Sequence, residues 1–443
     1  MQPSGQPPSC AKRLRWWPLV TAVFAVALTV RLAVAAVSPL WMHDDGVGYD
    51  QVAQSIVRGE GFSRNGRPTA VEDPLYPGFL ALVYRVFGHH PWAVRAVQSV
   101  LNAAACSLVA VLGVFAGGPA AGWLSGLSAA CYPSLVKVSC HWLSEALFIP
   151  LLVGALTAWT QWQRVMRARW ALVSGLLFGL ASLTRFGVAA LPYVLAWLAW
   201  RRARSMDGPI RSGMRRQALL MLLAMAVTIL PWTIRNWLVF HEVIPISTKI
   251  GLDVYASYFP PDGKRFGLTP VDANMALARS MTSETKASVL LIRETWRLVT
   301  QHPVEVLRQL VLKIGFFVTP FDWEILGYRV YNIGYSLVIP WALAGLYVAR
   351  RRRLLVGPLL TMLAYYGVLT VVTYGSPRLR LPLEPAFLVF AAITWLAFAE
   401  RARPMAVRLP VLATWSAGNL FLWWHASGLH GLIKRLASSV GLW

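Results

Sequence analysis

Residues 16–37 read WWPLVTAVFAVALTVRLAVAAV, an apolar run that contains one charged side chain, Arg31. A helix needs about 20 residues to cross a bilayer, so this run is long enough to do so. A basic segment, Lys12 to Arg15, precedes it as in a signal peptide, but the run is longer than the apolar part of a signal peptide and the following sequence is equally apolar. We therefore expect a retained first span, preceded by a disordered cytoplasmic segment at residues 1–15.

The whole chain has the composition of a multi-pass membrane protein. Of its 443 residues 56% are hydrophobic and 14% are charged, whereas a soluble protein carries about 25% charged residues. The chain holds 42 Lys and Arg against 19 Asp and Glu, a net charge of +23. In a membrane protein Lys and Arg collect in cytoplasmic loops, so this excess reports orientation and we expect no nucleic-acid partner. The 4 cysteines are too scattered for a disulfide framework or a zinc finger.

Basic clusters orient the predicted spans. They occur at residues 12–15, 164–169, 201–216, 350–353 and 401–408. If all of these lie inside, the chain is an all-α protein with about eleven spans, in a range of roughly nine to thirteen. We expect these spans near 16–38, 91–116, 119–138, 142–162, two in 171–200 that meet at Thr184-Arg185, 217–234, 335–349, 354–374, 385–400 and 409–426. Residues 304–320 then form an interfacial or half-inserted helix with Lys313 near the headgroups.

The acidic residues were not used to derive this orientation, so their positions give a partly independent check on it. Only Asp207 and Glu400 fall on the inner side, and the other acids fall at or beyond the outer surface. The longest outer loops are 39–90 and 235–334, and we expect juxtamembrane helices in them. Any chemistry is therefore expected outside the cytoplasm. The predicted membrane core covers residues 16–400, and residues 401–443 form a C-terminal membrane segment and tail.

The first outer loop begins WMHDDGVGYD at residues 41–50 and brings Asp44, Asp45 and Asp50 together at the end of a span. A partly desolvated carboxylate at the membrane surface can act as a general base. The alternative is a solvated loop that only keeps the segment outside. Further on, Glu72 and Asp73 precede a Pro-rich turn that would hold them in place, or that is simply a helix entry.

His141 and Glu145 are four residues apart at the start of the fourth predicted span. On a helix this spacing puts both side chains on one face, where they can share a divalent cation or, more simply, a hydrogen bond. Some basic residues are predicted on the outer side of the membrane and are therefore exceptions to the positive-inside rule. A phosphate or pyrophosphate substrate would explain them, and headgroup contact is the alternative. They are Arg185, Arg235, Lys249, Arg378 and Arg380.

Several short motifs occur in an order that resembles one family. They are Asp45-Gly-Val-Gly-Tyr49-Asp50, Gly59-Glu-Gly61-Phe62-Ser63, Pro74-Leu-Tyr76-Pro77-Gly, Tyr132-Pro133, Ser144-Glu145, Leu183-Thr184-Arg185, Arg235-Asn236-Trp237, Ile246-Ser247-Thr248 and Arg378-Leu-Arg380-Leu-Pro382. Together they resemble GT-C glycosyltransferases of the protein-mannosyltransferase-like and aminoarabinose-transferase-like group, glycosyltransferase family 39. The resemblance runs from about residue 16 to residue 400.

The resemblance implies a GT-C fold and an enzyme of the plasma (inner) membrane, with its active site on the extracytoplasmic face. Its partners would be a polyprenyl-phosphate-linked sugar donor, membrane lipid, and a glycan, lipid or protein acceptor chosen by loop 235–334. The implied catalytic residues are Asp45 as general base, with Asp44 as its substitute, and Glu145. The candidate substrate-binding residues are Tyr49, Asp50, Glu72, Asp73, Tyr76, His141, Arg185, Lys249, Arg378 and Arg380. A divalent cation, if one binds, would use Asp45, His141 and Glu145.

The chemistry of such a donor favours a single displacement. A lipid phosphate is a good leaving group, so one base on the acceptor and cations at the phosphate suffice, and the reaction inverts the sugar. The competing hypothesis is a transporter or flippase of a lipid-linked or anionic solute, whose charged residues would lie near the bilayer midplane. A membrane scaffold without catalytic activity is the third, but it leaves the ordered motifs unexplained.

Overall fold

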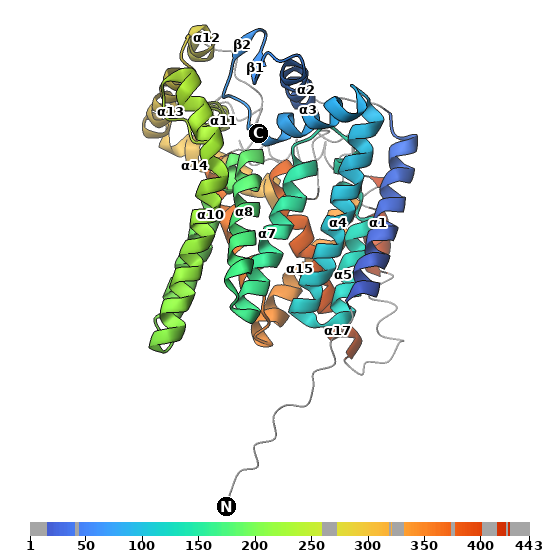
Figure 1. The fold of residues 1–443 in the computed structure, drawn as a ribbon. Coiled ribbons are helices and arrows are strands. Elements are labelled where there is room, and N and C mark those ends of the chain that lie inside the picture. The colour runs from blue at the N-terminus through green and yellow to red at the C-terminus, as the bar shows by residue number, and fades with distance from the viewer. Residues whose placement is uncertain are drawn as a thin grey trace, which may run out of the picture.

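Long helices run side by side in a bundle, and shorter elements cover one of its ends (Figure 1). The computed structural model describes residues 16–39, 44–258, 273–318, 320, 332–373, 377–400, 414–421 and 424–425. The bundle contains α1 (Trp17–Val37), α4 (Pro91–Gly117), α5 (Pro119–Cys131), α6 (Pro133–Cys140), α7 (Glu145–Val165), α8 (Ala168–Thr184), η1 (Phe186–Val188), α9 (Leu191–Ala203), α10 (Gly208–Phe240), α15 (Ile333–Arg351), α16 (Gly357–Val372), η3 (Pro377–Leu383) and α17 (Glu384–Glu400).

The covering elements come from the two long loops. The first loop contributes α2 (Asp44–Val57), the two-residue strands β1 (Ser63–Arg64) and β2 (Arg67–Pro68), and α3 (Leu75–Phe87). The second contributes α11 (Ile250–Tyr258), α12 (Ala273–Ser280), α13 (Glu284–Gln301) and α14 (Pro303–Val318). The expected juxtamembrane helices are therefore present, and the small antiparallel hairpin is an addition to the expected all-α fold.

The described residues form a multi-pass membrane protein. Five helical segments are long and apolar enough to cross a bilayer, namely Trp17–Val37, Pro91–Gly117, Gly208–Phe240, Ile333–Arg351 and Arg378–Ala399. Shorter apolar helices include Ala168–Thr184 and Gly357–Val372. The count of about eleven spans stays a prediction. The predicted segment 1–15 lies outside the described residues, as does part of the last predicted span at 409–426, of which residues 414–421 are helical.

One predicted helix break is confirmed, and one further break was not predicted. The break at Thr184-Arg185 is confirmed, because α8 ends at Thr184 and α9 begins at Leu191. Residues 119–138, expected as one span, do not form one continuous helix, because α5 ends at Cys131 and α6 begins at Pro133 after a turn at Tyr132. Pro133 explains this turn, since proline has no backbone N–H and disfavours a helical conformation in the residue before it.

Arg31 stabilises this turn from inside the bundle. Its side chain is buried and donates hydrogen bonds to the carbonyl oxygens of Ala130, at 3.1 Å, and Ala129, at 3.4 Å. In a continuous helix the Ala129 carbonyl would accept from the N–H of residue 133, which Pro133 lacks. The one charge in the first span thus satisfies carbonyl groups that the helix break leaves free.

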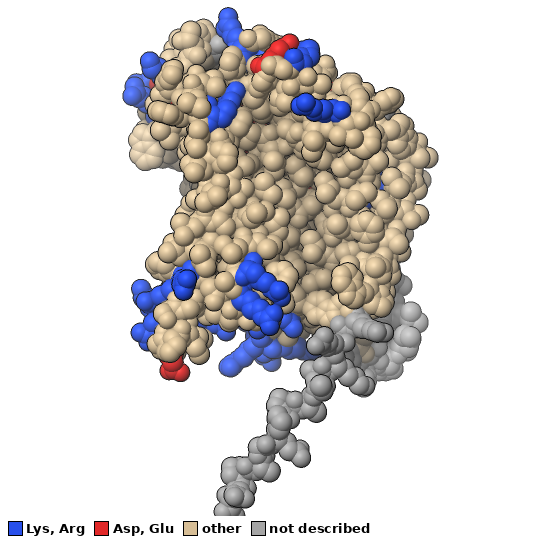
Figure 2. Space-filling view, viewed as in Figure 1, with Lys and Arg blue, Asp and Glu red and all other residues tan. Residues whose placement is uncertain are grey.

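Charged side chains gather at the two ends of the molecule. Figure 2 shows Lys and Arg clustered at the end opposite to the hairpin, a second group near the hairpin, and a band of other residues between them. The basic loops around Arg201 and Arg351 are exposed. This distribution is the one expected of a protein whose middle faces lipid.

Helix α14 lies at the end of the bundle that carries α11 and α13 (Figure 1), in line with a helix that does not cross. The predicted position of Lys313 is wrong, however. Its side chain is fully buried, and its ammonium lies 3.7 Å from the ring centroid of Tyr258 instead of reaching the headgroups. Contact with the aromatic face offsets part of the cost of burying this charge.

Hydrogen bonds join the two long loops to each other. The Glu284 carboxylate on α13 accepts hydrogen bonds from Thr69 Oγ1, at 2.7 Å, and from the Ala70 backbone N–H, at 2.8 Å. Arg235, near the end of α10, donates to the carbonyl oxygens of Phe62, at 2.8 Å, and Thr69, at 3.0 Å. These bonds fix the loop that leads into Glu72 and Asp73.

Candidate active site

Arg378 joins two of the predicted acidic residues. From η3 its Nη2 donates to Glu145 Oε2 at 2.9 Å, and its Nε binds Glu145 Oε1. Its Nη1 donates to Asp45 Oδ2 at 2.5 Å. Arg185 also forms an ion pair with Glu145. Four residues from the first loop, α7, the α8–α9 break and η3 therefore form one charged cluster.

Glu145 is the buried centre of this cluster. It is the first residue of α7, and its side chain has no exposed surface. A buried carboxylate is costly unless it is paired and hydrogen-bonded. The guanidinium groups of Arg185 and Arg378 supply both, and their own side chains are 20% and 11% exposed. The cluster is thus partly exposed through the side chains of its two arginines.

Asp45 lies at the exposed edge of the cluster, with a side chain that is 36% exposed. Burial alone would raise the pKa of Asp45, but the positive charges of Arg378 and Lys249 outweigh this effect and hold the pKa well below its usual range. Asp45 is therefore ionised at neutral pH. It is a weak proton acceptor as long as Arg378 remains bound to it.

Lys249 brings a third cation to the same region. Its ammonium lies 3.5 Å from Glu72 Oε2, and Glu72 Oε1 lies 3.7 Å from Arg64 Nη1. Burial lowers the pKa of Lys249, but Glu72 and other nearby negative charges raise it well above its usual value. Lys249 is consequently a permanent positive charge beside Asp45.

Asp73 and Glu72 bind different partners. It accepts hydrogen bonds from Ser247 Oγ, at 2.8 Å, and from the Phe186 backbone N–H, at 3.4 Å. Burial raises the pKa of Asp73 to about 7, and it raises that of nearby Asp253 to about 6. Asp73 joins the loop before α11 to the α8–α9 break, so it positions the segments that carry Lys249 and Arg185.

Three other predicted substrate-binding residues lie within the packing of the first loop. Asp50 accepts from Tyr84 OH at 2.6 Å and from Gln54 Nε2 at 2.7 Å, and it binds the His89 ring at 2.8 Å. The Tyr76 hydroxyl donates to Gln98 Oε1 at 2.8 Å, and the buried Tyr49 ring packs edge-on against the Tyr76 ring with 5.1 Å between centroids. In this arrangement these residues hold α2 against α3 and α4.

The structure does not bring Arg380 to the cluster. Its buried side chain donates to the Phe317 carbonyl oxygen at 3.1 Å and lies 3.6 Å from the ring centroid of Tyr335. Asp44 begins α2, and its side chain lies outside the described part of the structure. Arg235 binds loop carbonyl groups instead of facing the cluster.

The expectation that His141 and Glu145 share one helical face is wrong. α6 ends at Cys140 and α7 begins at Glu145, and His141 between them is extended, with φ −112° and ψ 156°. Gln98 Nε2 donates to the His141 carbonyl oxygen at 3.1 Å and holds the chain in this turn. In the part of the chain that the structure describes, no three His, Cys, Asp or Glu side chains lie close enough to hold a metal ion. With Arg378 bound to both Asp45 and Glu145, the residues as placed do not fit the divalent cation considered from the sequence.

Two important residues were missed in the sequence. Arg95 is buried and donates to the carbonyl oxygens of Ala35, Ser38 and Pro39, so it anchors the start of the first loop. Arg64 supports Glu72 from the hairpin. Arg64 is a basic residue in a predicted outer loop, which is the signal that singled out Arg378, whereas Arg95 lies inside the predicted span 91–116, near its start.

A protein family matches the middle of the chain, and this confirms the family resemblance. Residues 68–232 match the model of the dolichyl-phosphate-mannose-protein mannosyltransferase family. This segment includes Glu145 and Arg185, whereas Asp45, Lys249 and Arg378 lie outside it. No curated protein matches the sequence.

Solved structures support the fold. The apo oligosaccharyltransferase of Archaeoglobus fulgidus is 12% identical, with a TM-score of 0.55 over 93% of this chain and 54% of that chain. The oligosaccharyltransferase AglB of the same organism, in complex with an inhibitory peptide and a dolichol-phosphate, is 11% identical, with a TM-score of 0.54 over 94% and 56%. ArnT from Cupriavidus metallidurans, bound to undecaprenyl phosphate, is 14% identical, covers 86% and 76%, and has a TM-score of 0.43, too low to establish a common fold.

At these identities the likeness shows the fold alone, a GT-C-like helical bundle. The chain spans about half the length of the oligosaccharyltransferases that it matches. Residues 68–232 thus resemble the dolichyl-phosphate-mannose-protein mannosyltransferase family, and the bundle as a whole has a GT-C-like fold.

Proposed function

We propose that this protein transfers a sugar from a polyprenyl-phosphate-linked donor to an acceptor outside the cytoplasm. The acceptor is a cell-envelope glycan, a lipid or a protein. In this proposal the protein lies in the plasma (inner) membrane with its N-terminus in the cytoplasm, and the end that carries α2 and α3 faces outward. The spans number about eleven when the shorter apolar helices also cross.

The family supports the donor class. Its model is described by a lipid-phosphate-linked sugar, dolichyl-phosphate mannose. AglB, which has a similar fold, was solved with a dolichol-phosphate. A polyprenyl phosphate has the same headgroup chemistry, an anion at the end of an apolar chain, and it suits a site at the end of a membrane bundle.

The observation that carries the proposal is the charged cluster around Arg378. Arg185, Arg378 and Lys249 bring three cations to one end of the bundle, each paired with a carboxylate. Arginine binds phosphate oxygens through two parallel hydrogen bonds, and cations at this point stabilise the charge that develops on the departing phosphate. A family that uses a lipid-phosphate donor needs this feature.

Arg378 also controls the base. When it binds Asp45, the carboxylate is a poor proton acceptor. A donor phosphate competes for the same guanidinium, and the pKa of Asp45 rises when that contact is lost. Asp45 then accepts the proton of the acceptor hydroxyl as this oxygen attacks the anomeric carbon and the bond to the lipid phosphate breaks. Attack opposite the leaving phosphate inverts the sugar, and Glu145 keeps the two arginines in place.

The transporter hypothesis is less well supported. Its charged residues would lie near the bilayer midplane. Here the cluster sits where α7 begins and α8 ends, next to the covering elements of the first loop.

The test uses the full-length protein in lipid nanodiscs with a panel of labelled polyprenyl-phosphate sugars. Release of polyprenyl phosphate and the anomeric configuration of the product are measured. We expect Asp45→Asn to slow transfer by at least about 100-fold while donor binding persists, since a general base contributes about 10²–10⁴-fold. Exposed Arg85→Ala on α3 is the matched control and should leave transfer unchanged. Near-normal transfer by Asp45→Asn, or movement of intact donor across proteoliposomes without cleavage, would contradict the proposal.

A further inference from the structure

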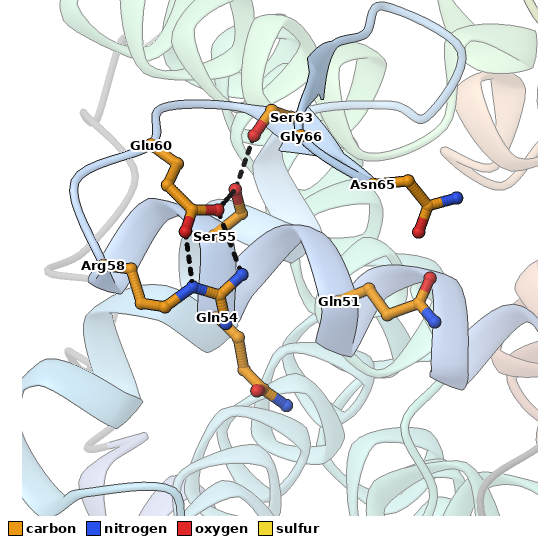
Figure 3. Close-up of a pocket in the computed structure, with 8 residues that line it drawn as sticks. All are labelled: Gln51, Gln54, Ser55, Arg58, Glu60, Ser63, Asn65 and Gly66. Atoms are coloured by element: carbon orange, nitrogen blue, oxygen red, sulfur yellow. Dashed lines mark hydrogen bonds and ion pairs between the residues drawn. The ribbon is translucent and has the colours of Figure 1, made fainter.

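A polar cavity of about 170 Å³ opens between α2 and the hairpin (Figure 3). Its eight lining residues come from α2 and from the segment that contains the β1–β2 turn. None of them has an aliphatic or aromatic side chain. The cavity is therefore unsuited to a lipid chain, and its ligand must be recognised by hydrogen bonds.

The cavity carries no net charge. Arg58 Nε binds Glu60 Oε1 at 2.8 Å, so the one cation and the one anion among the lining residues neutralise each other. Ser55 Oγ is 2.9 Å from Glu60 Oε2 and 2.5 Å from Ser63 Oγ, and these bonds close the floor of the cavity. A phosphate would find no free cation here, whereas a neutral, hydroxyl-rich molecule would not be repelled.

Two amide side chains are available for such a ligand. Gln51 uses its Oε1 to accept from Arg64 Nε at 3.3 Å, and its amide nitrogen has no hydrogen-bond partner among the described residues. Asn65 stands at the hairpin turn with φ +53°, followed by Gly66 with φ +73°, and its exposed amide is likewise free in the described structure. Figure 3 shows both amides on the same side of the cavity, one on the hairpin and one on α2. An amide can donate to and accept from neighbouring sugar hydroxyls.

The cavity is connected to the charged cluster. Gln51 lies six residues after Asp45 on α2, a rise of about 9 Å at 1.5 Å per residue. Arg64, which binds Gln51, also pairs with Glu72 at 3.7 Å, and Glu72 pairs with Lys249 at 3.5 Å. A continuous polar path thus runs from the cavity to the cations of the proposed active site. Its length suits one or two sugar units beyond the unit whose hydroxyl reaches Asp45.

We infer that this cavity is an acceptor subsite that binds a neutral sugar unit of a glycan acceptor. The inference rests on the proposed function and narrows it, because it selects a glycan over a lipid or a protein as the acceptor. It also places acceptor recognition on the first outer loop, in addition to the second loop predicted from the sequence.

The test is binding of the full-length protein in nanodiscs to an array of neutral oligosaccharides, with acidic oligosaccharides and Ser/Thr-containing peptides printed beside them. We expect neutral oligosaccharides to bind. The double variant Gln51→Ala, Asn65→Gly should bind about 30-fold more weakly, because it loses the hydrogen bonds of two amide side chains. Glycine accepts the positive φ at position 65, so the hairpin keeps its turn. The control Arg85→Ala should bind like the wild type.

Two results would overturn the inference. One is the absence of binding to any neutral oligosaccharide, or unchanged binding by the double variant. The other is binding of peptides or acidic oligosaccharides that the double variant weakens. Asp45→Asn separates this inference from the proposed function, since it should lose transfer and keep glycan binding. If the proposed function is wrong, the transfer assay of Asp45→Asn will show it. The glycan array tests only the acceptor subsite.

Discussion

Arg378 holds Glu145 through two hydrogen bonds, from Nε and from Nη2, and so joins η3 to the first residue of α7. The two residues are separated by 233 positions in the sequence. Because Glu145 is fully buried, this pair is both a structural bond and the support of the proposed phosphate site.

Removing one partner of this pair should damage folding as well as activity. Arg378→Met leaves the Glu145 carboxylate with one of its two arginines, and breaking a buried ion pair costs about 3–5 kcal/mol. We expect a lower Tm for Arg378→Met, and recovery of most of that loss in the double variant Arg378→Met, Glu145→Gln, measured by thermal unfolding in nanodiscs. Transfer should stay low in both. A double variant no more stable than the single one would contradict this account of the pair.

Asp73 should make stability depend on pH. In the unfolded chain its carboxyl ionises near pH 4, whereas burial raises its pKa to about 7 in the folded protein. Between these values only the folded state holds the proton, so the stabilising contribution is present at the acid end and is lost as pH rises toward 7. Asp73→Asn stays neutral and can still accept from Ser247. The Tm of the wild type relative to Asp73→Asn should fall by about 2–5 °C between pH 5 and pH 8.

The control for this prediction is Asp207→Asn, which changes an exposed acid at the start of α10. Its Tm difference from the wild type should not vary between pH 5 and pH 8. Asp253 also titrates near pH 6 but is present in both proteins, so the comparison removes its contribution. A difference between wild type and Asp73→Asn that is the same at every pH would show that Asp73 is ionised throughout.

The sequence predicted those parts of the fold that depend on local pattern. Apolar length located α1, α4 and α10, and the polar pair Thr184-Arg185 located a helix break. The acids of the site were also predictable, because Asp45 and Glu145 fall on family motifs. What joins them was not, since Arg378 reaches Asp45 across 333 positions and no local pattern encodes that contact. The same holds for Lys313, whose burial depends on Tyr258 of another helix.

Helix spacing alone predicted the wrong geometry at His141. A separation of four residues means a shared face only if the helix is continuous, and the turn before Glu145 breaks it. That turn depends on Gln98, which lies on α4 and binds the carbonyl oxygens of Ser139 and His141. Tertiary hydrogen bonds therefore decided the local structure, and the sequence near His141 did not contain that information.

Arg31 should stabilise the bundle without taking part in transfer. Arg31→Met keeps much of the side-chain volume but leaves the Ala129 and Ala130 carbonyl groups without their donors. Each unsatisfied buried polar group costs about 1–3 kcal/mol. We expect a clearly lower Tm, with normal transfer per folded molecule at a temperature where the variant is folded. Leu32→Met, at an exposed position on the same helix, is the control and should leave Tm unchanged. A normal Tm for Arg31→Met would show that these carbonyl groups do not need the guanidinium.

Gly251 should be essential for the position of Lys249, two residues before it. A Cβ atom at Gly251 would lie 2.4 Å from the Ser288 carbonyl oxygen of α13, far closer than atoms can approach. Gly251→Ala therefore has to push α11 away from α13, at a cost of about 1–3 kcal/mol for overpacking. Gly213→Ala on α10 is the matched control, because nothing lies within 4 Å of its Cβ and alanine favours the helix. We expect Gly251→Ala to lower both Tm and the rate of transfer, whereas Gly213→Ala should keep both at wild-type level or slightly raise Tm. Transfer at the wild-type rate by both variants would contradict this prediction. It would mean that the packing of α11 on α13 does not position Lys249 for the reaction, and the role of Lys249 in the proposed site would have to be given up.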